Sequence, residues 1–423
     1  MDGTSIINKL THFLRDAAGT IGIVFSLSTI PVLLVMGSAT DLVSANNMRT
    51  RMQAAVDAAA LAAATTGGLT AVQRQDLAVS AFHQNFAGGL ANGVVATPAF
   101  TITDTAVTGS ASAQLGTLFM RIAHINALDI SAEVKVSIPQ SKDVEIALVL
   151  DYSGSMKEIA DGEVKYQAMA TAATGLVTDL ASSGKARFGL APFSHHVYLS
   201  MPNKYVMGQG QLGTYLGCTQ DRLDPYNLTD GLPDTADEST KWGQPQAPEH
   251  SADGCAPYAG KKLQVLPMTD DLNAVTTQLA AMKPNAWTHI SLGMEFGWQL
   301  VSPDGLWGAD VASYDDTGTE KWIILLTDGR QTEPAHGLDG VRNVARGERN
   351  LELLCEAVKA KNISVVTIAY DLQDEPTETR LEECASLDKN GNPRFYRAGD
   401  GASISEVFTE IKNELAEAIF ISR

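Results

Sequence analysis

The pattern of apolar and polar positions begins with a long uncharged run. Residues 17–40 contain no charged side chain, and 24 residues in a helix extend about 36 Å, enough to cross a hydrocarbon core of about 30 Å. The pattern predicts a transmembrane helix over residues 17–40 after a stub over residues 1–16. A removable secretory signal peptide is the alternative, but the length of the run and the lack of an Ala-x-Ala site at its end favour a membrane span.

Alanine-rich sequence follows this run directly. Residues 41–66 predict a helical stem continuous with the span, because alanine is the strongest helix former. A stripe at three- and four-residue spacing fits either packing on the chain's own domain or helix–helix assembly; its members are Met48, Met52, Ala55, Ala59 and Ala62. Residues 67–142 combine a helical piece, residues 71–84, with alternating runs at residues 99–103 and 130–138, which predicts a small α+β stalk region.

A different kind of apolar run starts at Val144. Residues 144–150 are apolar except for Glu145, as in a strand that is buried on both faces. From there strands and helices alternate, which predicts an α/β domain with a doubly wound, mainly parallel sheet over residues 143–423. The predicted strands are residues 144–150, 186–191, 321–327 and 363–370, and the predicted helices are residues 162–182, 340–360 and 403–419.

Residues 200–262 interrupt this alternation with a segment rich in Gly, Pro, Asp and Asn, which predicts a functional loop or a separate insertion. Its acidic residues lack the spacing of an EF-hand, so a solvated acidic loop is favoured over a calcium site; they are Asp221, Asp224, Asp230, Asp234, Asp237 and Glu238. Just before the segment, His195 and His196 are expected to point to opposite faces of a strand, which favours structural histidines over metal ligands.

Composition and the motifs that are absent argue against some classes of function. A net charge of −18 argues against nucleic-acid binding. The four cysteines form no C-x-x-C pair, and among three possible connectivities we predict the bridges Cys218–Cys255 and Cys355–Cys384. An even number of cysteines and an acidic body favour a cytoplasmic amino terminus and an exported body. No G-x-S-x-G, P-loop or H-E-x-x-H motif occurs, so we expect no enzyme.

Candidate chemistry follows the strand at residues 144–150. The next residues present one carboxylate and two hydroxyls at alternate positions, Asp151, Ser153 and Ser155. The carboxyl edge of a parallel sheet is where open α/β folds bind ligands. Hard oxygen donors that converge there suit Mg²⁺.

Two further elements complete the pattern: Asp328 follows a second buried strand, and Thr288 precedes a predicted helix that starts near Ile290. With these elements in this order, the chain resembles a von Willebrand factor A (vWA) domain that carries a metal-ion-dependent adhesion site. The resemblance implies a cation held by Asp151, Ser153, Ser155, Thr288 and Asp328. Mg²⁺ is the expected ion, with Mn²⁺ or Ca²⁺ as alternatives.

Residues 9–64 resemble the Flp (tight adherence, Tad) pilus-assembly TadE/TadG-like proteins. The resemblance rests on a basic stub, Ala18-Gly19, an apolar span with Pro31, then Asp41 and the run Val56–Ala62. Pilin-like members carry a glutamate five residues after a processing glycine, and with Gly19 as that glycine the position is Val24. The resemblance therefore implies the TadG branch, which stays membrane-anchored and often carries a vWA domain.

Together the resemblances imply a single-pass protein of a bacterial inner membrane with a periplasmic or surface-exposed body. They imply a role in Flp/Tad pilus biogenesis, with other pilus components or pilin-like subunits as partners. The vWA domain is expected to bind an acidic side chain of a protein partner through the cation. Two alternatives stay open: a surface adhesin independent of pilus assembly and, less favoured because no general base is evident, an enzyme whose metal activates water.

Overall fold

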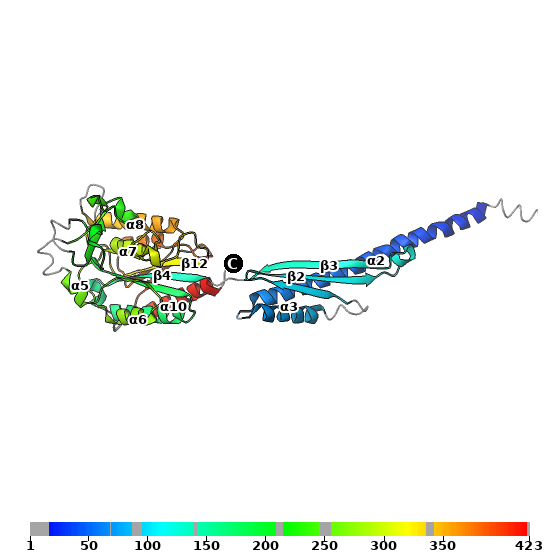
Figure 1. Ribbon diagram of the computed structural model, residues 1–423, viewed down its shortest axis with the longest axis horizontal. Helices are drawn as coiled ribbons and strands as arrows, with labels where there is room; N and C mark the ends of the chain where they lie inside the picture. The colour runs from blue at the N-terminus through cyan, green and yellow to red at the C-terminus, as the bar shows by residue number, and fades with distance from the viewer. Residues whose placement is uncertain are drawn as a thin grey trace, which may run out of the picture. The chain divides into compact units, whose positions relative to one another are not determined.

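The chain forms two compact units that divide between Gln140 and Ser141 (Figure 1). The computed structural model describes residues 17–67, 69–86, 95–138, 142–208, 215–245, 255–335 and 342–420. The predicted stub over residues 1–16 therefore lies outside the described residues.

One long helix organises the amino-terminal unit. Helix α2 runs from Ala17 to Thr65 and includes Pro31, so the predicted span and stem form a single element. Helix α3 (Ala71–Phe86) packs against it. An antiparallel sheet in the order β1-β2-β3 completes the unit and is formed by β1 (Thr97–Ile102), β2 (Ala106–Gly116) and β3 (Ala127–Ser137). The small antiparallel sheet predicted before the α/β domain is thus present.

The small-residue stripe of α2 packs inside its own unit. Met52, Ala55 and Ala59 are buried in a core that also contains Phe82 of α3 and Val107 of β2. Small side chains allow the helix to lie close to the sheet, since a larger side chain at these positions would hold the two apart. Of the two interpretations of the stripe, packing on the chain's own domain accounts for its buried members.

A mainly parallel sheet forms the centre of the second unit. Its strands follow the order β10-β9-β8-β7-β4-β12-β13-β14, and β11 (Leu266–Thr269) also pairs with β7. The parallel neighbours are β7 (Ala186–Phe193), β4 (Asp143–Asp151), β12 (Thr319–Thr327), β13 (Ser364–Tyr370) and β14 (Phe395–Ala398). Their carboxyl ends therefore meet at one edge of the sheet.

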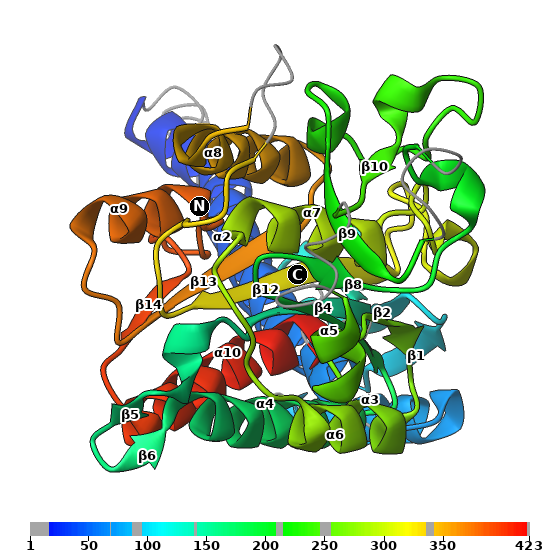
Figure 2. The same ribbon diagram turned by 90° about the vertical axis from the view of Figure 1, so that its left-hand side faces the viewer.

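Helices cover both faces of this sheet (Figure 2). One face carries α4 (Lys165–Ala181), α6 (Leu272–Ala281) and α10 (Gly401–Phe420), and the other carries α7 (Ile290–Val301), α8 (Val344–Ala360) and α9 (Glu375–Cys384). Ile146 and Leu148 of β4 face the first layer, whereas Ala147 and Val149 face the second. Burial on both faces explains the unbroken apolar run of this strand, and the predicted vWA-like architecture is confirmed.

Where predicted boundaries differ from the observed ones, local turns are the cause. The helix predicted from residue 162 begins at Lys165, because a two-stranded hairpin of β5 (Ile159–Ala160) and β6 (Glu163–Val164) precedes it. The helix predicted from residue 340 begins at Val344, where the Asn343 side chain accepts a hydrogen bond from the backbone N–H of Arg346. This contact is a helix amino-terminal cap.

The described part of residues 200–262 adds strands to the central sheet, which differs from the expectation of a functional loop and leaves the alternative of an insertion. Strand β9 (Cys218–Arg222) pairs antiparallel with β8 (Val197–Tyr198) and with β10 (Trp242–Gly243). The segment also contains the short helix α5 (Ala256–Gly260). The sequence Cys-Thr-Gln-Asp-Arg of β9 lacks alternating apolar residues, which is why its pattern did not predict a strand.

The acidic residues of this segment do not all face solvent. Asp221 and Asp230 are buried, so the solvated-loop interpretation is wrong for these two. Asp230 accepts hydrogen bonds from the hydroxyls of Ser302 at 2.6 Å and Tyr314 at 2.5 Å. These bonds attach the segment to the chain that follows α7.

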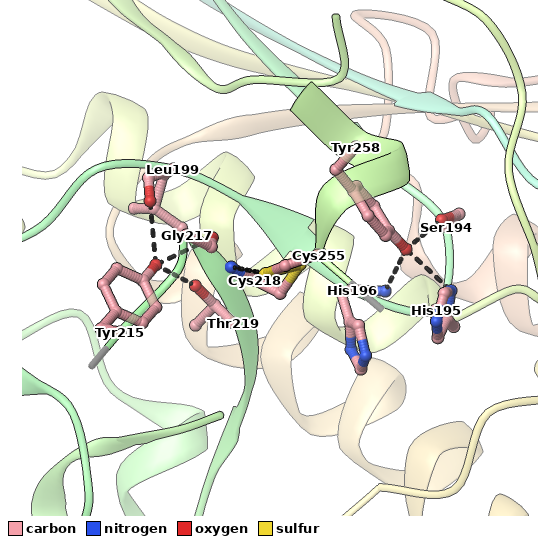
Figure 3. The surroundings of a disulfide bond; sticks show 10 residues. All are labelled: Ser194, His195, His196, Leu199, Tyr215, Gly217, Cys218, Thr219, Cys255 and Tyr258. Atoms are coloured by element: carbon pink, nitrogen blue, oxygen red, sulfur yellow. Dashed lines mark hydrogen bonds between the residues drawn. A yellow bond between two sulfur atoms is a disulfide. The ribbon is translucent and has the colours of Figure 1, made fainter. Parts of the chain in front are cut away.

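The two adjacent histidines also lie differently from the expectation. His195 and His196 occupy the turn between β7 and β8, and their ring centroids are 4.1 Å apart, so they do not point to opposite faces of a strand. The Tyr258 hydroxyl of α5 accepts a hydrogen bond from the His196 backbone N–H at 3.0 Å and shares others with Ser194 and His195 (Figure 3). Helix α5 thereby fixes the turn.

Two disulfides connect elements of the second unit. Cys218–Cys255 joins β9 to the start of α5, and Cys355–Cys384 joins α8 to α9. This is the pairing that the sequence predicts. Each bridge closes a loop of the chain, which reduces the conformational entropy of the unfolded state.

A buried ion pair holds β9 to the helical layer. Arg222 Nε lies 2.9 Å from Glu295 Oε1 of α7, and both side chains are about 1% exposed. The indole N–H of Trp242 donates to the same carboxylate oxygen at 2.9 Å. The added strands are therefore attached by a charge pair that is removed from water.

Replacing Glu295 by Leu should leave the Arg222 guanidinium buried without a counter-charge and lower the free energy of unfolding by about 3–5 kcal/mol. The Arg222→Met/Glu295→Leu double variant should lose less than either single variant, because no charge is then left unpaired. Denaturation of the full chain in detergent, followed by tryptophan fluorescence, measures this, since all five tryptophans lie in the second unit. Glu356→Leu on the exposed side of α8 is the control; equal losses in the singles and the double would contradict the prediction.

Candidate metal centre

Three neighbouring strands end in aspartates at the same edge of the sheet. Asp151 ends β4, Asp328 directly follows β12, and Asp371 directly follows β13. Because β4, β12 and β13 are parallel and adjacent, their carboxylates are brought together. Asp371 was not among the predicted site residues, although its place directly after a buried strand is the signal that identified Asp328.

The loop after β4 connects the first two carboxylates. Asp151 Oδ1 accepts a hydrogen bond from the Ser153 backbone N–H at 2.7 Å, and its Oδ2 accepts one from the Thr327 hydroxyl at 2.6 Å. The Ser153 and Ser155 hydroxyls lie 3.1 Å apart, and Ser155 Oγ donates to Asp328 Oδ1 at 2.6 Å. Four of the five predicted ligands thus belong to one chain of hydrogen bonds.

Thr288 lies on the loop before α7, and this loop approaches the loop after β4. The Gly154 N–H donates to the Ala286 carbonyl at 2.7 Å, and a Cβ added at Gly154 would lie 3.0 Å from that oxygen, so the two loops approach too closely for a larger side chain. Thr288 Oγ1 and Ser155 Oγ lie 3.4 and 3.7 Å from the point that a Cβ at Gly329 would occupy. The structure therefore gathers all five predicted donors.

Lys165 is a site residue that sequence reasoning missed. It is the first residue of α4, and its ammonium lies 3.2 Å from Asp328 Oδ2 and 2.9 Å from Asp371 Oδ2. The side chain is 4% exposed, so this positive charge is a fixed part of the site. A single lysine at the start of a helix carries no sequence pattern that would have identified it.

Burial and like charge make the site electrostatically costly without a cation. Burial raises the pKa of Asp151 to about 7, and the nearby Asp328 carboxylate contributes in the same direction. Burial also raises the pKa of Asp328, against the hydrogen bond from Ser155 and the positive charge of Lys165. Lys165 therefore offsets only part of the cost of holding two carboxylates together.

The donor set fits a hard divalent cation. Two carboxylates and three hydroxyls are all oxygen donors, and a cation among them would relieve the cost of the buried carboxylate pair. Lys165 approaches Oδ2 of Asp328, whereas Oδ1 accepts the hydrogen bond from Ser155. Among the described residues, no group of three or more His, Cys, Asp or Glu side chains is arranged to hold a metal ion. The five predicted donors include only two carboxylates, so they are not a group of that composition.

The strand order and the loop after β4 define an α/β protein of vWA-like fold. Residues 19–66 match the Tad family model, described as "Putative Flp pilus-assembly TadE/G-like". The amino-terminal region is thus TadE/G-like, and in this chain it precedes a vWA-like domain. No curated protein matches the chain.

Several solved structures of pilus proteins are similar to this chain. They include the pilus adhesin SpaC from Lactobacillus rhamnosus GG, at 14% identity and a TM-score of 0.39 over 77% of this chain and 35% of that chain. The vWF domain of the type V pili tip protein Mfa5 from Porphyromonas gingivalis matches at 13% identity and a TM-score of 0.40, over 67% of this chain and 97% of that domain. The PilB minor pilin from Streptococcus sanguinis matches at 11% identity and a TM-score of 0.37, over 77% and 79%.

This chain therefore spans about a third of the SpaC chain and nearly all of the Mfa5 domain.

The raised pKa of Asp151 predicts a pH dependence of stability when no metal is present. An acid whose pKa is raised by folding favours the native state when it is protonated, so its contribution is fully present below about pH 4 and is lost as the pH rises through about 7. In EDTA at pH 8, Asp151→Asn should therefore raise the free energy of unfolding, by up to about 4 kcal/mol, and at pH 4 it should have little effect. Denaturant titrations at several pH values measure the difference, with the exposed Asp161→Asn as the control. A gain that is equal at both pH values would contradict the assignment.

Proposed function

We propose that this chain is a membrane-anchored component of Flp/Tad pilus biogenesis whose vWA domain binds a protein partner through a divalent cation. The convergence of Asp151, Ser153, Ser155, Thr288 and Asp328 at the carboxyl edge of the sheet is the observation that carries the proposal. Mg²⁺ is the expected ion, and Mn²⁺ or Ca²⁺ are alternatives. The partner presents an acidic side chain and belongs to the other pilus components or pilin-like subunits.

The five donors would hold the cation, which when bound supplies a coordination position for a carboxylate oxygen of the partner. Ser153, Ser155 and Thr288 are neutral donors, so they leave most of the positive charge available to the partner. Asp151 is oriented by Ser153 and Thr327. Lys165 holds Asp328 through one oxygen and reduces the net negative charge around the cation. An acidic partner is therefore favoured over a basic one.

The surface around the site supports an acidic partner. Lys157, at the end of the loop after β4, and Arg330, two residues after Asp328, are exposed in a chain whose net charge is −18. Burial lowers the pKa of Lys261, and the charge of Lys157 lowers it further, which places a second lysine near Lys157. Positive charges around a binding site attract negatively charged partners and raise the rate of association.

An exposed tryptophan adds an apolar contact next to the proposed cation. Trp287 precedes Thr288 and is 62% exposed. Its loop is fixed by two backbone hydrogen bonds, from Asn285 N–H to the Tyr152 carbonyl and from Gly154 N–H to the Ala286 carbonyl. Rigid, exposed aromatic side chains are common anchors of protein interfaces. Trp287 therefore provides affinity that does not depend on charge.

The helix α2 supports anchoring in a membrane. Among the described residues, it is the one helix that is long and apolar enough to cross a membrane. Its second half is part of the core of the amino-terminal unit, through Met52, Ala55 and Val56. If the apolar run were a removable signal peptide, the cleavage site would lie inside the continuous helix α2. A membrane anchor requires no cleavage there. The proposed topology is a single span in a bacterial inner membrane, with the amino terminus in the cytoplasm and the two folded units periplasmic or surface-exposed.

A metal titration tests the proposed site. The midpoint of thermal unfolding of the full chain in detergent should rise when Mg²⁺, Mn²⁺ or Ca²⁺ replaces EDTA, by the equivalent of about 2.7 kcal/mol at a hundredfold excess over the dissociation constant. Ser153→Ala/Ser155→Ala should fold and lose this response. Ser182→Ala/Ser183→Ala, just after the end of α4 that lies away from Lys165, is the matched control. If the Ser153/Ser155 variant responds as the wild type does, or no ion stabilises the wild type, the metal site is refuted.

Filament formation separates the proposed function from a surface adhesin. Deletion of the gene should abolish filaments, and the Ser153→Ala/Ser155→Ala variant should fail to restore them although it accumulates to the wild-type level. Electron microscopy of the cells measures filaments directly. Normal filaments combined with lost surface attachment would instead support an adhesin that is independent of pilus assembly.

A further inference from the structure

The connection between β2 and β3 carries an unusual group of exposed apolar side chains. This hairpin tip, residues 117–126, contains a short 3-10 turn, Met120–Ala123. Leu118 is 66% exposed and Ile122 63%, and Phe119 and Ile125 are each more than 40% exposed. Exposed apolar groups of this kind usually mark a surface that is covered by a membrane or another molecule.

The tip is fixed to α2 by a carboxylate at the point where the uncharged run of the helix ends. Asp41 Oδ1 accepts a hydrogen bond from the Leu118 N–H at 3.1 Å, and its Oδ2 accepts from Phe119 at 2.9 Å and Met120 at 2.8 Å. Charged acceptors make hydrogen bonds stronger than neutral ones do. The height of the tip along α2 is therefore set by Asp41.

The tip reaches past Asp41 into the uncharged run. The Phe119 ring contacts α2 at Gly37, where an added Cβ would lie 2.3 Å from the ring carbon Cγ. Gly37 is four residues before Asp41, which places this contact about 6 Å further along the helix toward the apolar segment. Leu118 and Ile122 flank this contact in sequence and are exposed at the same end of the hairpin.

From these contacts we infer that the hairpin tip inserts into the headgroup and upper acyl region of the lipid bilayer beside the α2 span. The inference rests on the anchoring of α2 in the membrane, which is part of the proposed function. Gly37 belongs to the uncharged run that is proposed to lie in the bilayer. Residues of the tip at the level of Gly37 are therefore next to the lipid that surrounds the span. The tip thus adds a second, peripheral membrane contact to the transmembrane one.

The charges of the tip agree with a lipid partner. Residues 117–126 contain Arg121 and no acidic residue, although the chain as a whole carries a net charge of −18. Interfacial segments combine apolar side chains with basic residues whose charged ends stay at the headgroups. Arg121 would add attraction to anionic lipids. Two points of contact with the membrane would hold the amino-terminal unit in a fixed orientation at its surface.

Spin labels on the full chain in phosphatidylcholine–phosphatidylglycerol vesicles test the inference. A label at Leu118→Cys or Ile122→Cys should collide several-fold more with oxygen, relative to a water-soluble nickel chelate, than a label at Thr105→Cys. Thr105 is the matched control because it is exposed and lies at the opposite end of β2. A label at Val32→Cys, on the exposed surface of the span, reports whether α2 itself is in the bilayer.

Suppose that labels at positions 118 and 122 collide with the nickel chelate as often as the label at position 105 does, while the label at position 32 is in lipid. The inference about the tip is then wrong, but the proposed membrane anchoring by α2 is supported. Labels 118 and 122 that are shielded from both reagents would show a protein partner at the tip, such as a second copy, and would also overturn it. If label 32 collides with the nickel chelate, the membrane anchoring of the proposed function fails, and the inference fails with it. Two exposed labelling sites guard against an effect of one substitution on folding.

Discussion

The second unit depends on the pairing of β4 with β12, because this pairing fixes Asp151 and Asp328 beside each other at one edge of the sheet. Two buried carboxylates at close range repel each other, and burial alone already disfavours their charged forms. The protein offsets this with hydroxyl donors and the ammonium of Lys165. The remaining imbalance is what a divalent cation would remove. The strand pairing therefore brings the two carboxylates together, and the loops around them supply neutral oxygen atoms.

The fold was largely predictable because its main signals are local. Residues buried on both faces of β4 give a continuous apolar run, and the alanine-rich continuation of the span predicts one long helix. The oxygen donors of the loop after β4 were predictable because they follow one another in sequence. Lys165 was not predicted, since its role arises only when α4 packs next to the site, whereas Asp371 was overlooked although it follows a buried strand as Asp328 does. Strands β9 and β10 were missed for a related reason. They are held by partners far away in the sequence, such as Glu295, and not by an apolar pattern of their own.

The insertion shows how polar residues can form a core when each has a partner. Its sequence looks like a solvated loop because it is rich in Asp, Gly and Pro. Yet Arg222 and Asp230 are buried, and each is satisfied by a charged or hydroxyl group from α7 or the chain after it. Burying a polar group costs little when its hydrogen bonds are replaced. Composition alone therefore does not distinguish a loop from a polar layer added to a sheet; the distinction lies in the partners.

The two units use an aspartate at the end of an apolar run in different ways. Asp41 accepts hydrogen bonds from three backbone N–H groups, and these donors cannot move unless the hairpin tip unfolds. Asp328 is held by side-chain donors only, the Ser155 hydroxyl and the buried Lys165 ammonium. Three backbone donors therefore make Asp41 a structural link between α2 and the hairpin tip, whereas the contacts of Asp328 are made by side chains. The type of donor thus separates the structural role of Asp41 from the role that we propose for Asp328.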